Sequence, residues 1–151
     1  MRLGRIDAPS RKAGIIMKAR TFPAAPEHLG AVLAFITEEL EKADCSMKVC
    51  MQVQMAAEEI FVNIAHYAYH PVSGSAEVRC EVGGEPPRVV LQFMDGGKPF
   101  DPLKKPDADT ALSTEAREIG GLGILMVKKT MDAVRYAYQD GKNILTIEKE
   151  L

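Results

Sequence analysis

The chain has 151 residues, of which 46% are hydrophobic and 26% charged, with a formal net charge of −2. This size and composition predict one folded domain with a single core, and the charge balance excludes nucleic-acid binding by bulk electrostatics. The longest apolar runs are too short to cross a bilayer. Residues 1–13 are basic and polar and lack a signal peptide's apolar stretch. We therefore expect a disordered leader over 1–13, one domain over 14–151 and a cytoplasmic location.

Apolar periodicity and the positions of glycine and proline predict a strand, two helices, two strands, a long loop, a helix and two final strands. The expected ranges, in that order, are 14–22, 27–43, 47–69, 76–82, 88–95, 96–121, 123–132, 133–139 and 142–150. The final two strands turn at Asp140–Gly141, a dipeptide typical of hairpins. This order predicts an α+β fold: a two-layer sandwich with a mixed or antiparallel sheet and three helices on one face.

Glu59 and Asn63 are polar residues within the otherwise apolar stretch of the second predicted helix, EEIFVNIAHYAY at 58–69. They stand four residues apart, so both side chains are predicted to project from the same helix face. On its own, this pair is also compatible with a cap or a salt bridge between two helices.

Two glycine-containing motifs lie far from this helix in the sequence. Asp95 ends an apolar strand and is followed by Gly96 and Gly97. A carboxylate there can accept a hydrogen bond from an amino group, and glycine lets the backbone approach a flat ligand. The stretch GGLGI at 120–124 directly precedes the third helix, where free N–H groups and the helix dipole favour an anion such as phosphate. It matches neither a P-loop nor the dinucleotide fingerprint, and each motif alone is also compatible with an ordinary turn.

Together, in this order and at these spacings, the three motifs resemble the ATP-binding boxes of the GHKL (Bergerat-fold) superfamily, which includes gyrase, histidine kinases and anti-sigma-factor kinases. Glu59-x-x-x-Asn63 resembles the N box, Asp95-x-Gly97 the first glycine box, and Gly121-Leu122-Gly123 the second. The short single domain, the PFDP sequence after the first glycine box and the helix before a terminal hairpin are most similar to the RsbW-like serine/threonine kinases, which control sigma factors by partner switching.

The resemblance implies that ATP and Mg²⁺ are bound. It implies that Glu59 is the catalytic base for an attacking hydroxyl, that Asn63 is a ligand of Mg²⁺, and that Asp95 accepts a hydrogen bond from the adenine amino group. The other residues for which it implies nucleotide contacts are His66, Tyr67, Gly97, Gly120, Gly121, Leu122, Gly123 and Asn143. Residues 102–119 would form a lid over the nucleotide.

Three positions depart from the pattern of these relatives. His66 stands where histidine kinases usually carry Lys or Arg, and Tyr67 where many serine kinases of this group carry His. Ile119 stands where some relatives have an Arg that reaches the γ-phosphate, with Arg117 as a nearby substitute. The change at 119 bears on the rate of transfer more than on nucleotide binding.

Three functions are compatible with this reading. The first is a serine/threonine kinase that phosphorylates a small STAS-like antagonist of an anti-sigma factor. The second is an ATP-binding regulatory module that sequesters a sigma factor or another partner with little or no transfer. The third, a detached histidine kinase catalytic domain, is disfavoured because the residues before the first helix cannot build a helical hairpin. Similarity to anti-sigma kinases also implies a homodimer, formed through the first strand and helix, with no direct nucleic-acid or membrane partner.

Overall fold

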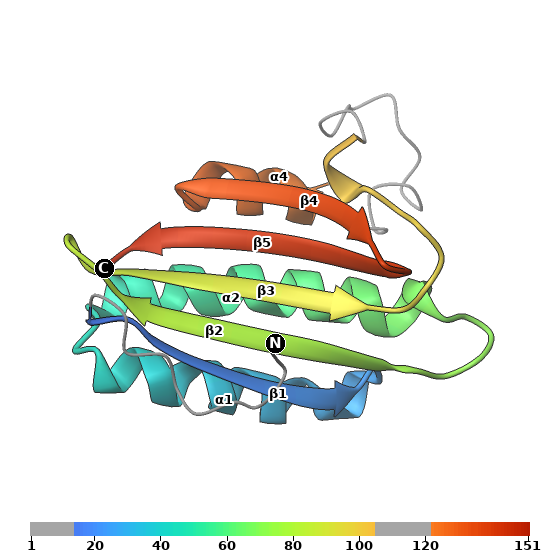
Figure 1. Cartoon of the computed structure of the whole chain (residues 1–151), viewed down its shortest axis with the longest axis horizontal. Helices are drawn as coiled ribbons and strands as arrows, with labels where there is room; N and C mark the ends of the chain where they lie inside the picture. Colours follow the sequence, from blue (N-terminus) through green and yellow to red (C-terminus); the bar gives the residue numbers. More distant parts are fainter. Residues whose placement is uncertain (1–13, 105–121) are drawn as a thin grey trace.

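The fold is a two-layer α+β sandwich in which helices cover one face of a five-stranded sheet (Figure 1). A computed structural model describes residues 14–104 and 122–151. The predicted leader and the lid residues 105–119 lie outside the described residues, as do Gly120 and Gly121. None of the helices within the described ranges has the length and apolar character needed to span a bilayer.

The sheet is antiparallel throughout, which decides between the mixed and antiparallel alternatives left open by the sequence. Its strands are β1 (Ile16–Pro23), β2 (Ser75–Gly83), β3 (Arg88–Asp95), β4 (Ala133–Gln139) and β5 (Lys142–Glu150), in the order β1-β2-β3-β5-β4. The last strand therefore lies between β3 and β4, and its register sets Asn143 opposite Asp95. At the β4–β5 turn, Asp140 and Gly141 both have positive φ, 54° and 76°, which confirms the predicted hairpin.

The helices match the predicted ranges closely. They are α1 (Leu29–Lys42), α2 (Met47–Asn63) and α4 (Leu122–Thr130), with short helical turns η2 (Pro26–His28), η3 (Ile64–Ala68) and η4 (Pro102–Lys104). Ser46 caps α2, because its Oγ accepts a hydrogen bond from the Val49 N–H at 3.2 Å. The single helix predicted over 47–69 is instead α2 followed by the five-residue π-helical turn η3.

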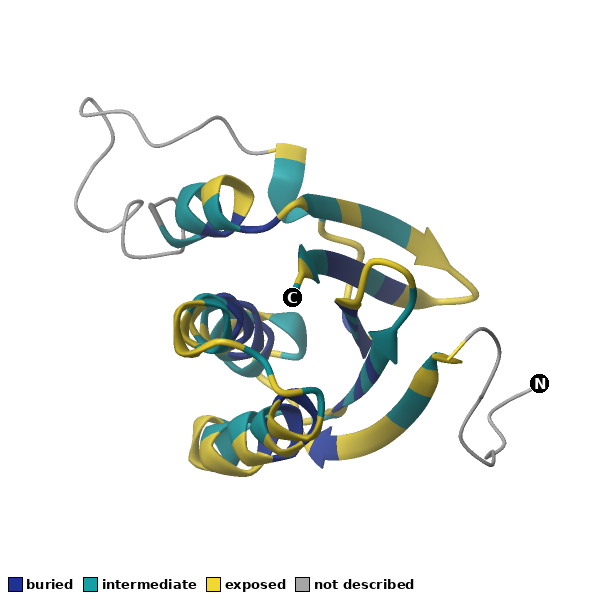
Figure 2. Cartoon of the chain, turned by 90° about the vertical axis from the view of Figure 1, so that its left-hand side faces the viewer, coloured by how far each residue is buried: buried dark blue, intermediate teal, exposed yellow. Residues whose placement is uncertain are grey.

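The core lies between the sheet and the helix layer, where the buried residues of both gather (Figure 2). In β2 and β3 every second residue points into it, as the period of an extended strand requires. The largest fully buried side chains include Phe61, Phe93, Ile36, Leu40, Leu91 and Ile147. This core holds the end of α2 against the ends of β3 and β5, where the predicted site residues lie.

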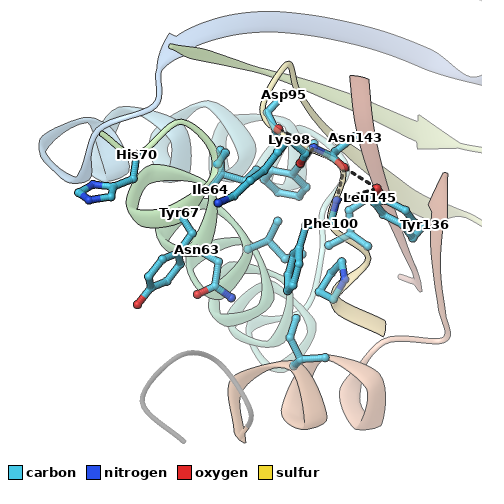
Figure 3. A pocket seen from close by; sticks show the side chains of 15 residues that line it. Asn63, Ile64, Tyr67, His70, Asp95, Lys98, Phe100, Tyr136, Asn143 and Leu145 are labelled. Atoms are coloured by element: carbon cyan, nitrogen blue, oxygen red, sulfur yellow. Dashed lines mark hydrogen bonds between the residues drawn. The ribbon is translucent and has the colours of Figure 1, made fainter. Parts of the chain in front are cut away.

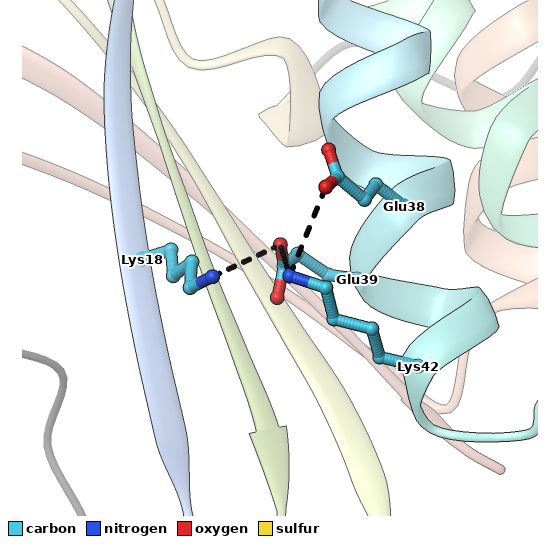
Figure 4. Close-up of polar contacts among 4 residues, drawn as sticks. All are labelled: Lys18, Glu38, Glu39 and Lys42. Atoms are coloured by element: carbon cyan, nitrogen blue, oxygen red, sulfur yellow. Dashed lines mark hydrogen bonds and ion pairs between the residues drawn. The ribbon is translucent and has the colours of Figure 1, made fainter.

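A buried carboxylate joins α1 to the first strand (Figure 4). The Glu39 side chain is 9% exposed, and its Oε2 lies 3.6 Å from Lys18 Nζ and 3.3 Å from Lys42 Nζ. Lys42 also lies 3.8 Å from Glu38, whose side chain is 68% exposed. Two neighbouring acidic residues of α1 thus share one lysine but differ sharply in burial.

We expect Glu39→Ala to lower the free energy of unfolding by about 1–2 kcal/mol, because it removes the carboxylate that pairs α1 with β1. Glu38→Ala is the matched control and should cost less than about 0.5 kcal/mol, as is usual for an exposed pair. Urea unfolding of both variants measures the difference. Equal small losses would show that the contact between Glu39 and Lys18 adds no stability.

Candidate functional site

A cavity of about 380 Å³ opens between the end of α2, the ends of β3 and β5, and α4 (Figure 3). Small-molecule sites usually measure about 300–1,000 Å³ and combine apolar walls with a few polar groups. The residues that line this cavity are Ile60, Asn63, Ile64, Tyr67, Ala68, His70, Phe93, Asp95, Lys98, Phe100, Pro102, Ile124, Tyr136, Asn143 and Leu145. Its size and mainly apolar walls suit a flat organic ligand.

The cavity brings together predicted site residues that lie in three separate segments of the sequence. Four predicted contacts line it: Asn63, Tyr67, Asp95 and Asn143. Glu59, Gly97 and His66 do not line the cavity, but each contacts one of these four residues. His66 is exposed and is not among the lining residues. Gly120 and Gly121 lie outside the described residues, and of Leu122 only the backbone, at the start of α4, is described.

Asp95 is a buried carboxylate, 6% exposed, at the end of β3. Its Oδ1 accepts hydrogen bonds from the Gly97 N–H and from Nδ2 of Asn143, both at 2.9 Å. Its Oδ2 accepts none from the described residues, and the side chain lines the cavity. A carboxylate acceptor with one uncommitted oxygen beside apolar walls is suited to bind the amino group of a ligand.

Glu59 and Asn63 lie on the same face of α2, as their spacing predicts, and their side chains are hydrogen-bonded. Asn63 Nδ2 donates to Glu59 Oε2 at 3.0 Å. An ionised carboxylate only accepts, so the amide nitrogen must face it, and Oδ1 of Asn63 remains available to the cavity. The pair thus presents a neutral oxygen beside an acidic side chain.

Both described glycines of the predicted boxes are required by close contacts within the protein. A methyl group at Gly123 would overlap the Glu59 carboxylate, and one at Gly97 would overlap the Ala68 carbonyl oxygen. The sequence interpretation assigned Gly97 to the approach of a flat ligand and Gly123 to a helix start whose N–H groups hold phosphate. The structure shows that Gly123 also lets α4 approach α2 and that Gly97 lets the segment after β3 approach η3. Their contacts with a ligand stay predictions.

The π-helical turn η3 carries His66 and Tyr67 at the rim of the site. Such turns are rare and occur frequently at functional sites. Tyr67 is 42% exposed and lines the cavity, and its ring lies edge-on to that of His66 with the centroids 5.8 Å apart. His66 therefore contacts Tyr67, which lines the cavity, but does not line the cavity itself.

Sequence reasoning missed most of the cavity wall. The missed residues are Ile60, Ile64, Ala68, His70, Phe93, Lys98, Phe100, Pro102, Ile124, Tyr136 and Leu145. The apolar ones follow the ordinary helix and strand periods, so nothing in the sequence separates them from core residues. Lys98 and Phe100 follow the first glycine box directly, and this proximity is a signal that could have found them.

At this site a magnesium ion would have to take some of its ligands from the nucleotide. The described residues contain no group of three or more His, Cys, Asp or Glu side chains that could hold a metal. The available oxygen of Asn63 is a hard, neutral ligand of the kind that Mg²⁺ takes together with phosphate oxygens and water. Asn63 therefore fits the predicted role.

Comparisons with known proteins agree with this geometry. A curated relative, the serine/threonine-protein kinase BtrW of Bordetella bronchiseptica, is 26% identical over 102 residues, which cover 68% of this chain and 71% of that protein. The family model of the histidine kinase-like ATPase domain matches residues 22–149 of this chain. That match takes in strands β2, β3 and β4, nearly all of β5, the three α-helices and every residue that lines the cavity, and it begins near the end of β1. The chain therefore belongs to the family of histidine kinase-like ATPase domains.

Proposed function

We propose that this protein is an ATP-dependent serine/threonine kinase of the anti-sigma-factor type, which phosphorylates a hydroxyl of a small STAS-like antagonist protein. Family membership supports ATP binding and a kinase-like function, and similarity to a serine/threonine-protein kinase supports a hydroxyl acceptor. The observation that carries the proposal is the hydrogen-bonded Glu59–Asn63 pair beside the cavity. A homodimer, by similarity to anti-sigma kinases, and a cytoplasmic location belong to the same proposal.

The cavity suits ATP in one orientation. Asp95 and Asn63 lie on opposite sides of it, and α4 begins on the Asn63 side (Figure 3). The adenine would lie between apolar walls with its amino group at Asp95. The phosphates would lie toward Asn63 and the N-terminus of α4, where the helix dipole favours negative charge.

In this orientation Glu59 and Asn63 have complementary tasks. Phosphoryl transfer requires mostly positioning and neutralisation of the phosphate charge, and a magnesium ion held here would supply the second. Asn63 would offer Oδ1 to that ion while its Nδ2 remains on Glu59. Glu59 would take the proton of the attacking serine or threonine hydroxyl as the oxygen bonds to the γ-phosphorus and the bond to ADP breaks.

The test begins with co-purification of partner proteins from the native host. Transfer from γ-labelled ATP to a serine or threonine of a small co-purifying protein is the expected result. Nucleotide binding without any transfer, with the correct partner and Mg²⁺ present, would instead support the alternative of an ATP-loaded module that sequesters a sigma factor. Transfer to histidine would contradict both.

Asn63→Ala is expected to weaken binding of Mg·ATP by roughly 10–100-fold, because the metal loses its protein ligand. Wild-type affinity should fall when Mg²⁺ is removed, whereas the variant should respond little. Gln54→Ala is the matched control, since this amide of the same helix is bonded to Thr37 at 2.6 Å. Calorimetry with and without Mg²⁺ decides, and wild-type affinity that is insensitive to Mg²⁺ would remove the metal assignment.

A further inference from the structure

Asn143 uses all of its hydrogen-bonding capacity within the protein. A carboxamide has two N–H donors and an oxygen with two lone pairs. In Asn143 the nitrogen donates to Asp95 Oδ1 and to the Lys98 carbonyl oxygen, both at 2.9 Å, and lies 3.4 Å from the Gly97 carbonyl oxygen. Its oxygen accepts from the Phe100 N–H at 3.0 Å and from the Tyr136 hydroxyl. The side chain is buried, so no group remains for a ligand.

Tyr136 determines which way the Asn143 amide faces. Its hydroxyl donates to Oδ1 of Asn143 and accepts from the Phe100 N–H at 3.3 Å. Burial raises the pKa of this hydroxyl above its ordinary value, so it remains a donor. Because Tyr136 and Phe100 both donate toward the amide oxygen, the amide nitrogen must face Asp95.

Three adjacent strands thus build one chain of hydrogen bonds, from Tyr136 on β4 through Asn143 on β5 to Asp95 on β3 (Figure 3). It commits Oδ1 of Asp95 to the protein and leaves Oδ2 to the cavity. It also holds the backbone of Lys98 and of Phe100 in place through hydrogen bonds to Asn143, and both residues line the cavity. A group that binds a ligand keeps its position accurately when supporting hydrogen bonds of this kind hold it rigidly.

We infer that Tyr136 and Asn143 are positioning residues that set the preference for a base with an exocyclic amino group, by fixing Asp95 without a hydrogen bond of their own to the base. This inference rests on the proposed function. It differs from the expectation by resemblance that Asn143 contacts the nucleotide, since its hydrogen-bonding groups are all occupied.

The test compares ATP with inosine triphosphate, which carries a carbonyl group where ATP carries the amino group. Tyr136→Phe keeps the ring and removes only the hydroxyl, so the preference for ATP over inosine triphosphate is expected to fall roughly 2–10-fold. Tyr138→Phe is the matched control: it lies on the same strand, 44% exposed, and should leave the preference unchanged. Competition against a fluorescent ATP analogue measures both affinities.

A second variant adds a pH signature that a merely structural role would not produce. Asn143→Asp would set a carboxylate 2.9 Å from Asp95, and two carboxylates so close repel each other when both are ionised, which favours uptake of one shared proton. Its ATP affinity, taken relative to wild type at each pH, is expected to be lowest near pH 8 and to recover as the pH falls and the pair takes up that proton. Wild type sets the baseline because the ATP phosphates titrate equally in both.

The outcomes separate the inference from the proposed function. Unchanged nucleotide preference in Tyr136→Phe would overturn the inference, as would an equal loss of both affinities. A pH-independent deficit in Asn143→Asp would also overturn it. If wild type binds no ATP, the proposed function fails, and the inference fails with it.

Discussion

Glu59→Gln is expected to slow phosphate transfer to the partner protein by roughly 10²–10⁴-fold, with ATP affinity within about threefold of wild type. Glutamine keeps an oxygen that can accept the Asn63 amide hydrogen, and its shape fits against Gly123 as the glutamate does. A neutral amide cannot take up the proton of the attacking hydroxyl. The variant therefore removes the base and preserves the site around it.

Glutamine is a sharper test than alanine because of the contact with Asn63. Glu59→Ala would also remove the acceptor that holds the Asn63 amide, and so would disturb the magnesium ligand together with the base. The measurement is phosphorylated partner against time at saturating ATP, with affinity from calorimetry. Glu58→Gln, an exposed neighbour on α2, is the control. Transfer at the wild-type rate in Glu59→Gln would contradict the base assignment.

Local features of the sequence predicted much of the fold and part of the site. The spacing of Glu59 and Asn63 placed both on one face of α2, and their hydrogen bond confirms it. Asp140–Gly141 predicted the β4–β5 turn, because both residues accept positive φ. Such predictions succeed when the determinants lie within one or two helical turns or within a hairpin.

The rest depends on contacts between distant segments. Asn143 and Asp95 are separated by 48 positions, and they meet only because β5 inserts between β3 and β4. The boundary of the π-helical turn and the apolar wall could not be distinguished from ordinary helix and core. The two glycines show the same limit. Their presence indicated the site, but the sequence could not show that Gly97 packs against Ala68 and Gly123 against Glu59, because these contacts join different elements.

Asp95→Asn is expected to lower ATP affinity roughly 10–100-fold and to shift the preference toward inosine triphosphate. The direction follows from the two donors on Oδ1, the Gly97 N–H and Asn143 Nδ2. An asparagine must keep its oxygen there, so its nitrogen takes the place of Oδ2 and donates into the cavity. Two donors would then face each other at the adenine amino group, whereas the carbonyl of inosine would gain a partner.

Competition binding with the two nucleotides measures this shift, with Asp101→Asn as the matched control. Asp101 is a nearby carboxylate whose Oδ1 accepts from the Leu103 N–H at 2.8 Å, and it is not among the residues that line the cavity. Its variant should keep the wild-type preference. A loss of affinity for both nucleotides in Asp95→Asn, without a change in preference, would show that Asp95 only holds the end of β3. Full ATP affinity in that variant would place the adenine elsewhere in the cavity, because an amide nitrogen cannot accept the hydrogen bond that this orientation requires.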